Sequence, residues 1–278
     1  MLKSILVGLD GSAYSQTAVE LGLHWAKRHD ALLVGLGIID EITISGYEFL
    51  RLGPPRSTPR YGDTNLLADA RRKVEQFLER FALRCAQEQV ACKVLEDVGD
   101  PPAQIALEAQ RYDLILLGRK TYFRFETEEG FDDILKKVLQ RSPRPVVTTP
   151  ESFRNRGPIL IAYDGSLQAA RAVQAFQATG LGEGCDVHVL CVDPTFTAAA
   201  RDADRAAEFL RFHDCKVVAH PLASQDPPDQ VILEQVRKLE PCLLVLGAFG
   251  TRGWREFLFG SVTASLLKKS PVPLFLYH

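Results

Sequence analysis

Near the C-terminus, four residues have types and a spacing that could hold an anion: Gly247, Gly250, Gly260 and Ser261. They stand in the order G-x-x-G, nine residues, G-S, between an apolar run that predicts a buried strand and a pattern that predicts a helix. Glycines at a strand exit let backbone N–H groups approach a ligand without a Cβ in the way. The first N–H groups of a helix are unpaired and electropositive. This combination suits phosphate, so we expect a nucleotide site in the C-terminal half.

The elements that must position these residues belong to an internal repeat. Asp10-Gly11-Ser12 returns as Asp164-Gly165-Ser166, at an offset of 154 residues. Asp100-Pro101-Pro102 returns as Asp226-Pro227-Pro228, at an offset of 126. Because the order of motifs is the same in both halves, we expect two domains, 1–150 and 151–278. The smaller second offset indicates an insertion in the first half, for which Gly46–Asn65 is the natural loop.

Each half alternates apolar strand runs with helical patterns. In the first half, strands are predicted at 5–9, 32–39, 90–96, 113–117 and 146–149, and helices after Ser12 and at 66–87, 102–110 and 134–140. Such alternation predicts an α/β fold of two tandem Rossmann-like domains, each a five-stranded, mostly parallel sheet flanked by helices. Ligands of such sheets bind at the carboxyl ends of the strands, where Asp10, Asp164 and Gly247 fall.

Composition narrows the class of partner and the compartment. The 33 Lys and Arg residues against 35 Asp and Glu leave a net charge of −2, which favours neither nucleic acid nor an anionic membrane as partner. No apolar run is long enough to span a membrane. The six cysteines form no C-x-x-C and the six histidines show no metal spacing, so we expect free thiols in a reducing cytoplasm and no metal site.

With these motifs, the chain resembles a tandem universal stress protein over nearly its whole length. The resemblance rests on a first strand ending in Asp-Gly-Ser, a Gly-Asp-Pro-like turn before a helix, and the G-x-x-G, nine residues, G-[ST] signature. It implies two adenine nucleotide alpha hydrolase-like domains. In ATP-binding members the glycine loop and G-[ST] hold the phosphates, and the Asp and a Val ending the second strand hold the ribose and adenine.

Carried over by motif, the resemblance implies an ATP or ADP site, with Mg²⁺, in the C-terminal domain. Asp164 would meet the ribose, beside the backbone of Ala162 and Tyr163, and Val192 would meet the adenine edge. The phosphates would lie on the glycine loop and the helix start, formed by Gly247, Gly250, Gly260, Ser261, Val262 and Thr263. Asp164 could equally be the N-cap of the following helix, and the two roles are compatible.

The N-terminal half departs from the pattern. Thr121 stands where the second glycine is expected, and Asp132 and Asp133 stand where Gly260 and Ser261 do. Glu126, Glu128 and Glu129 add further negative charge to the loop. Carboxylates at a helix start repel phosphate and take its place. We therefore predict that this half does not bind ATP in the family mode, that it serves structure, pairing or another ligand, and that Asp10 is a helix N-cap.

Three functions remain open at this point. The first is an ATP-dependent regulatory module in a stress response; the others are an interaction scaffold and a low-turnover ATPase. No P-loop motif is present and no residue is an obvious general base, so catalysis would be weak hydrolysis at most. The family also pairs through its last strands, here Val146–Thr149 and Leu274–Tyr277, which implies pairing of the two domains. A homodimer and an unidentified protein partner are left open.

Overall fold

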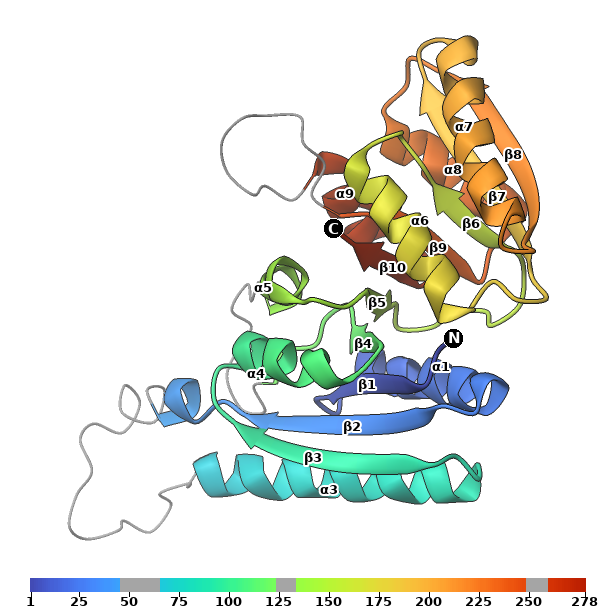
Figure 1. The fold of residues 1–278 in the computed structure, drawn as a ribbon. Coiled ribbons are helices and arrows are strands. Elements are labelled where there is room, and N and C mark those ends of the chain that lie inside the picture. The colour runs from blue at the N-terminus through green and yellow to red at the C-terminus, as the bar shows by residue number, and fades with distance from the viewer. Residues whose placement is uncertain (46–65, 124–133, 249–259) are drawn as a thin grey trace, which may run out of the picture.

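The computed structural model of the chain contains one ten-stranded sheet, made of two halves that repeat the same topology (Figure 1). The structure describes residues 1–45, 66–123, 134–248 and 260–278, so the predicted loop Gly46–Asn65 lies outside the described residues. Along the sheet the strands follow the order β3-β2-β1-β4-β5-β10-β9-β6-β7-β8.

The N-terminal half matches the predicted order of elements. Its strands are β1 (Ser4–Leu9), β2 (Leu32–Ile39), β3 (Cys92–Val98), β4 (Leu114–Gly118) and β5 (Val146–Thr149). Its helices are α1 (Ala13–His29), α3 (Leu66–Gln87), α4 (Pro101–Glu108) and α5 (Ile134–Arg141), with a 3₁₀ turn at Ala109–Arg111. The predicted strand at 90–96 begins two residues later, because its pairing with β2 starts at Cys92 opposite Leu33. The bounds of the other predicted elements of this half agree with the structure to within one or two residues.

The C-terminal half follows the same course. Its strands are β6 (Ile159–Ala162), β7 (Asp186–Asp193), β8 (Lys216–Ala223), β9 (Leu243–Gly247) and β10 (Leu274–Tyr277). Its helices are α6 (Leu167–Thr179), α7 (Phe196–Arg211), α8 (Pro228–Leu239) and α9 (Ser261–Lys269). Within each half every strand pairing is parallel. The predicted class is therefore confirmed.

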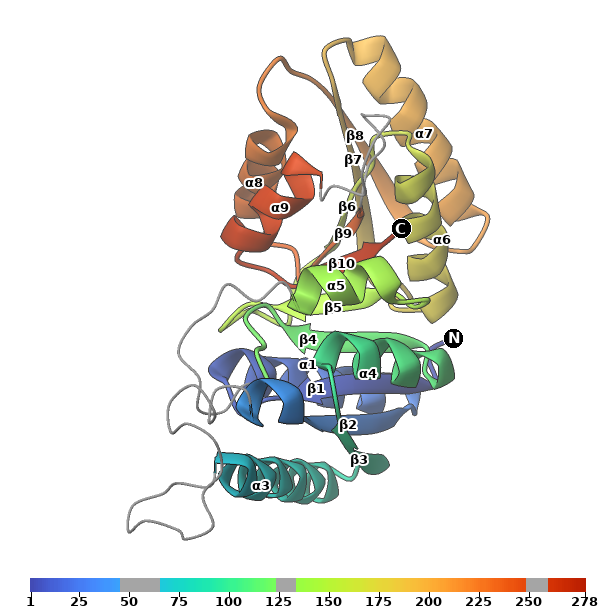
Figure 2. The ribbon, with the colours of Figure 1, turned by 90° about the vertical axis from the view of Figure 1, so that its left-hand side faces the viewer.

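Helices cover both faces of the sheet, as its central strands require. Buried residues of α1, α3, α6 and α7 form one core with one strand face, and those of α4, α5, α8 and α9 form a second core with the other. Figure 2 shows α8 and α9 on one side of the C-terminal strands and α6 and α7 on the other. Strands buried on both faces are near-continuously apolar, which explains runs such as Leu243–Leu246.

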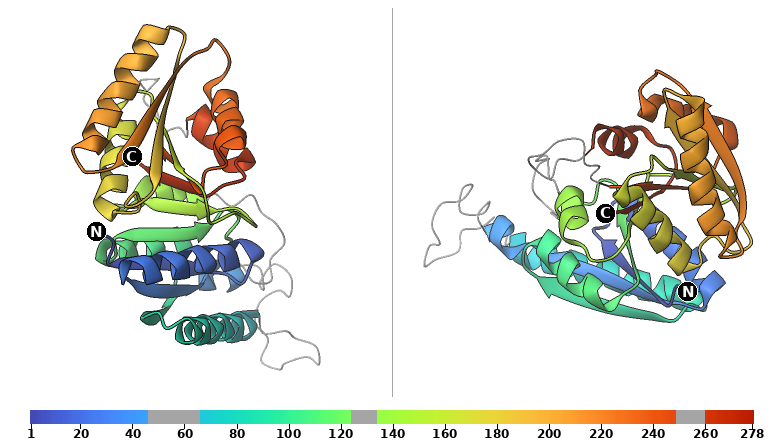
Figure 3. Two further views of the ribbon diagram at one scale, coloured as in Figure 1. Left: turned by 90° about the vertical axis from the view of Figure 1, so that its right-hand side faces the viewer. Right: turned by 45° about the horizontal axis from the view of Figure 1, so that its top comes forward.

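The two halves meet where β5 and β10 pair in antiparallel register, with Thr148 opposite Leu274 and Val146 opposite Leu276. These are the last strands of the two halves, as the resemblance implied. Both chain termini lie at this junction (Figure 3). The N-terminal ammonium donates to the carbonyl of Ala178 at 2.6 Å, which ties the start of the chain to the end of α6.

A half-buried guanidinium links the two halves at the junction. Arg119, which follows β4, donates to the carbonyls of Ser270 at 2.6 Å and Val272 at 3.2 Å in the other half. Burial lowers the pKa of Arg119 to about 10, which still leaves the group charged at neutral pH. In the other direction, the hydroxyl of Tyr277 donates to the carbonyl of Pro143 at 3.3 Å. Each half thus satisfies backbone carbonyls of the other.

Replacing Arg119 with Met should lower the free energy of unfolding by about 2 to 3 kcal/mol, because two buried carbonyls lose charged donors. The measurement is urea unfolding followed by circular dichroism. Arg156 is exposed and makes no hydrogen bond or ion pair with the described residues, so Arg156→Met is the control and should change little. Equal effects of the two substitutions would show that the Arg119 bonds do not hold the halves together.

Candidate functional site

The carboxyl ends of the strands gather most of the predicted site residues at one edge of the C-terminal sheet. The chain runs from β6 outward to β8 and then returns on the other side of β6 as β9, which makes the gap between β6 and β9 the switch point. Ala162 at the end of β6 lies opposite both Leu246 and Leu190. Asp164 and Val192, each two residues further on, therefore fall at the same level, and Tyr163 falls at the level of Gly247.

Asp164 begins the turn into α6 without being its cap. One carboxylate oxygen accepts the Ser166 N–H at 3.0 Å, and the Ser166 hydroxyl in turn accepts the Ala169 N–H at 3.1 Å as the N-cap of α6. The N-cap role that the sequence allowed for Asp164 is thus wrong, because a serine two residues later is better placed for the first turn. Among the described residues, nothing donates to the second oxygen of Asp164, and the side chain is exposed.

Gly247 has a packing reason to be glycine. A Cβ built on it would lie 2.6 Å from the Ala169 nitrogen, in the backbone of the first turn of α6. Gly118, its counterpart after β4, would meet the Tyr14 carbonyl carbon of α1 at 2.7 Å. Close approach of strand and helix therefore explains this glycine in both halves, including the half that lacks the rest of the motif. Gly247 alone does not indicate a ligand.

The start of α9 is the feature that does suit an anion. Gly260 precedes the helix and offers no side chain to cap it, and the first helical bond runs from the Ala264 N–H to the Gly260 carbonyl at 2.9 Å. In the part of the chain that the structure describes, the N–H groups of Ser261, Val262 and Thr263 have no acceptor. Such groups carry the positive end of the helix.

The first turn of α9 is held at the end of β9. The Thr263 hydroxyl lies 3.5 Å from the Gly247 carbonyl, at the limit of a hydrogen bond, and Thr263 is buried while Ser261 is exposed. The helix start and the strand edge that carries Asp164 thus share one side of the domain. Gly250, which the resemblance places in the phosphate loop, lies outside the described residues.

The corresponding edge of the N-terminal half is closed around the Asp10 carboxylate by its own groups, and an open cavity of about 450 Å³ lies beside it. Asp10 accepts the Ser12 N–H at 3.0 Å and the Ser12 hydroxyl at 2.7 Å on one oxygen, and the Tyr122 N–H at 2.8 Å on the other. Ser12 caps α1 by accepting the Ser15 N–H, so the predicted N-cap role of Asp10 is wrong in the same way as that of Asp164. Both oxygens of Asp10 are engaged, whereas within the described ranges only one oxygen of Asp164 accepts a hydrogen bond.

An aromatic ring adds to this closure. Phe123 is fully buried, and a Cβ on Gly8 of β1 would lie 3.0 Å from its ring. Its φ of +51° is an unusual, left-handed conformation for a bulky residue, which its buried ring maintains. Thr121 is also buried, and its hydroxyl donates to the Gly118 carbonyl at 2.8 Å. The acidic residues expected to repel phosphate, Glu126, Glu128, Glu129, Asp132 and Asp133, lie outside the described residues.

Sequence reasoning missed this closure, although the aromatic pair Tyr122-Phe123 directly after Thr121 was a signal for it.

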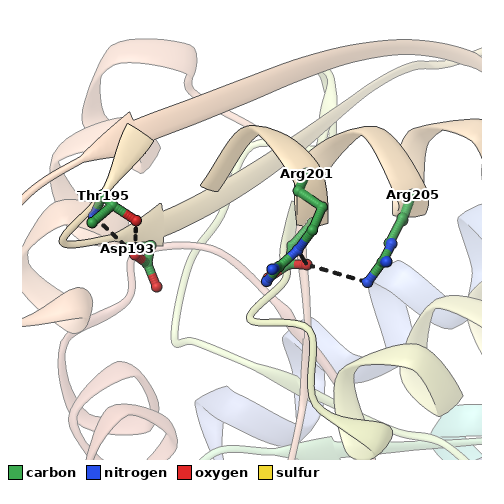
Figure 4. A network of polar contacts seen from close by, with 5 residues as sticks. Asp193, Thr195, Arg201 and Arg205 are labelled. Atoms are coloured by element: carbon green, nitrogen blue, oxygen red, sulfur yellow. Dashed lines mark hydrogen bonds and ion pairs between the residues drawn. The ribbon is translucent and has the colours of Figure 1, made fainter. Parts of the chain in front are cut away.

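Sequence reasoning also missed a charged cluster on α7, drawn in Figure 4. There the Asp202 carboxylate accepts from Arg201 at 2.9 Å and lies 3.8 Å from Arg205. The hydrogen bond from Arg201 lowers the pKa of Asp202. Nearby, Asp193 accepts both the N–H and the hydroxyl of Thr195, at 2.8 and 2.9 Å.

Two histidines also meet in a way that their spacing did not indicate. The Nδ1 atom of His188 on β7 lies 2.7 Å from the Nε2 atom of His220 on β8, and burial lowers the pKa of His220. In the described ranges, no three metal-ligating side chains cluster. Nor does any helix there have the length and apolar character needed to cross a membrane.

Comparison with known proteins agrees with the repeat. The model of the universal stress protein family matches residues 1–150 and again 155–278. A universal stress protein from Synechocystis is 24% identical over 172 residues, which are 60% of this chain and 58% of that protein, less than two thirds of its length.

Solved structures extend the likeness to the whole chain. A universal stress protein from Archaeoglobus fulgidus superimposes with a TM-score of 0.74 at 20% identity, over 99% of this chain and 97% of its own. A putative universal stress protein from Pseudomonas aeruginosa does so with a TM-score of 0.60 at 17% identity, over 99% and 93%. At these identities the likeness shows the fold alone.

The packing role of the two strand-end glycines can be tested without a ligand. Gly247→Ala and Gly118→Ala should each lower the free energy of unfolding by about 1 to 3 kcal/mol, because each new Cβ meets helix backbone that must move. Thermal unfolding of the nucleotide-free protein measures this. If Gly247→Ala were neutral while Gly118→Ala destabilised, close packing would not be the reason for Gly247.

Proposed function

Because this chain belongs to the universal stress protein family, we propose that its C-terminal domain binds one adenine nucleotide, ATP or ADP with Mg²⁺, and acts as a nucleotide-dependent regulatory module in a stress response. The observation that carries the proposal is the uncapped start of α9, held at the end of β9 on the edge where no described residue donates to the second oxygen of Asp164. Free donors and a free acceptor at a switch point are what a nucleotide needs.

The chemical character of the site fits the parts of the nucleotide. The N–H groups of Ser261, Val262 and Thr263 would receive phosphate oxygens, with Gly247, Gly250 and Gly260 giving the backbone room to approach. The second oxygen of Asp164 would accept a hydrogen bond from a ribose hydroxyl. A carboxylate suits a hydroxyl donor in this way, whereas it would repel a phosphate. The backbone of Ala162 and Tyr163 and the side chain of Val192 would border the base.

Mg²⁺ would come with the nucleotide and supply charge neutralisation for its phosphates. The protein need not provide a full set of ligands for it, because Mg²⁺ usually keeps several waters and binds through the phosphates of its substrate. A regulatory role requires only that the bound nucleotide changes the groups offered at this edge. It requires no general base, and we assign no catalytic residue.

The N-terminal domain has a different role in this proposal. Both oxygens of Asp10 are used within the fold, and the Phe123 ring is buried against Gly8 at the edge where a nucleotide would enter. A nucleotide there would have to displace a backbone N–H from Asp10 and expose the ring. We therefore propose one nucleotide per chain.

A scaffold that binds no nucleotide is the alternative. Its support is the packing of Gly247, which accounts for that residue without any ligand. The starts of α4, α7 and α8 also lack a side-chain cap, but the uncapped start of α9 favours the nucleotide because it lies at the switch point between β6 and β9.

The nucleotide content of the protein as purified gives the first test. Denatured protein should release about one ATP or ADP per chain, identified by ion-exchange chromatography and mass, since one helix start is open and one edge is closed. Two per chain would contradict the closed N-terminal edge. If no nucleotide is released and added ATP with Mg²⁺ does not bind, the scaffold function is the one that the result supports.

A charge substitution tests the site itself. Gly260→Asp with Ser261→Asp should weaken ATP binding by at least about a hundredfold, because two carboxylates would occupy the electropositive helix start and repel phosphate. Titration calorimetry measures the change. Ser261→Ala is the control for loss of the hydroxyl alone, and Asp10→Ala should bind as the unmodified protein does. Undiminished affinity in the double variant would rule out this site.

A further inference from the structure

A cleft of about 230 Å³ lies between α1 and α3 in the N-terminal domain, away from the proposed nucleotide site. These two helices cover the same face of the sheet, as the left view of Figure 3 shows. Leu9 and Phe81 give the cleft a buried apolar floor, and Val19 and Phe77 line its walls. Arg80 and Arg84, one turn apart on α3, stand at its rim. An apolar floor with two cations above it is an amphipathic site.

The positive charges of these two guanidinium groups are only weakly balanced by carboxylates of the protein. Arg80 stacks over the Phe77 ring, 4.9 Å from its centre, and its Nε donates to the Gln76 carbonyl at 3.2 Å. No carboxylate in the described residues lies within ion-pair distance of it. Arg84 reaches Glu20 of α1 only at 4.0 Å, with both side chains about half exposed, and such a pair contributes little.

The internal repeat supplies a comparison. A Cβ on Gly11 would meet the Phe77 ring, and a Cβ on Gly165 would meet the Asp202 carboxylate at 3.0 Å. Since both glycines belong to the Asp-Gly-Ser turn, Phe77 and Asp202 hold equivalent places on α3 and α7. Three residues later come Arg80 and Arg205.

In the C-terminal domain the equivalent arginine faces a carboxylate of the chain itself. The Asp202 carboxylate accepts a hydrogen bond from Arg201 and lies 3.8 Å from Arg205. Figure 4 shows the side chains of these two arginines on α7. In the N-terminal domain, the aromatic ring of Phe77 has taken the place of that acid. Arg80 keeps the place of Arg205, Arg84 adds a second cation where the C-terminal domain has Phe209, the acid is missing, and an apolar cleft lies beside them.

We propose that this cleft binds a small monocarboxylate with an apolar body, such as a short-chain fatty acid or an aromatic acid. The carboxylate would lie on Arg80 and Arg84, where the C-terminal domain uses Asp202, and the hydrocarbon would lie on Leu9, Phe81 and Val19. The cleft is smaller than the pockets of drug-sized ligands, which favours a small molecule. A nucleotide suits it poorly, because its polyphosphate and sugar would face an apolar floor.

Octanoate and its uncharged analogue 1-octanol test this proposal by titration calorimetry on the full chain. Octanoate should bind with one site per chain and clearly more tightly than 1-octanol. Arg80→Gln with Arg84→Gln should weaken it by about tenfold or more, because charge-assisted hydrogen bonds are lost. Arg71→Gln with Arg72→Gln removes the same charge from an exposed part of α3 and should leave binding unchanged.

Two further variants locate the site. Val19→Phe should fill the cleft and weaken octanoate binding with all charges kept. Gly260→Asp with Ser261→Asp should leave it intact, so that failure of the nucleotide site and failure of this cleft can be told apart. Equal binding of 1-octanol, equal loss in the two arginine double variants, or no saturation into the millimolar range would each overturn the proposal.

Discussion

The antiparallel pairing of β5 with β10 is the constraint on which the rest of this molecule depends. A parallel five-stranded sheet leaves its last strand with unpaired backbone groups, and those groups need a partner. Here the chain supplies that partner itself. The pairing joins the cores on both faces, brings both termini to the junction, and lets Arg119 and Tyr277 satisfy carbonyls across it. Because the pairing is antiparallel, the carboxyl edges of the two halves point in opposite directions.

The two edges show how one topology can be open or closed. In each half an Asp-Gly-Ser turn follows the first strand, and a serine caps the next helix. In the first half the segment after the fourth strand donates to Asp10 and its Phe123 ring is buried, whereas no described residue of the second half donates to the second oxygen of Asp164. Repetition therefore preserved the scaffold while the loops diverged.

The architecture was predictable because its signals are local and repeated. Apolar runs buried on both faces gave the strands, and the stripe from Ala70 to Cys85 gave α3 its observed bounds. The positions of Ala162, Asp164, Val192 and Gly247 at one edge followed from the topology. The cap was misassigned to Asp164 because Asp and Ser both favour such turns, and the choice between them depends on backbone geometry.

Contacts between distant segments were beyond the reach of sequence patterns. Nothing local indicates that Phe123 packs on Gly8, that His188 meets His220, or that Asp202 lies beside Gly165. These contacts depend on which strands are neighbours and how far each helix extends. The packing reason for Gly247 was likewise invisible until α6 was seen beside it.

The bond from Arg119 to Ser270 has an electrostatic consequence. Ser270 is the C-cap of α9, so a cation from the N-terminal domain lies at the negative end of the helix whose positive end is the proposed phosphate site. A positive charge there stabilises the helix macrodipole, as an anion does at the other end. The closed domain thus belongs to the electrostatic surroundings of the open one, and a C-terminal domain expressed alone would lack that charge.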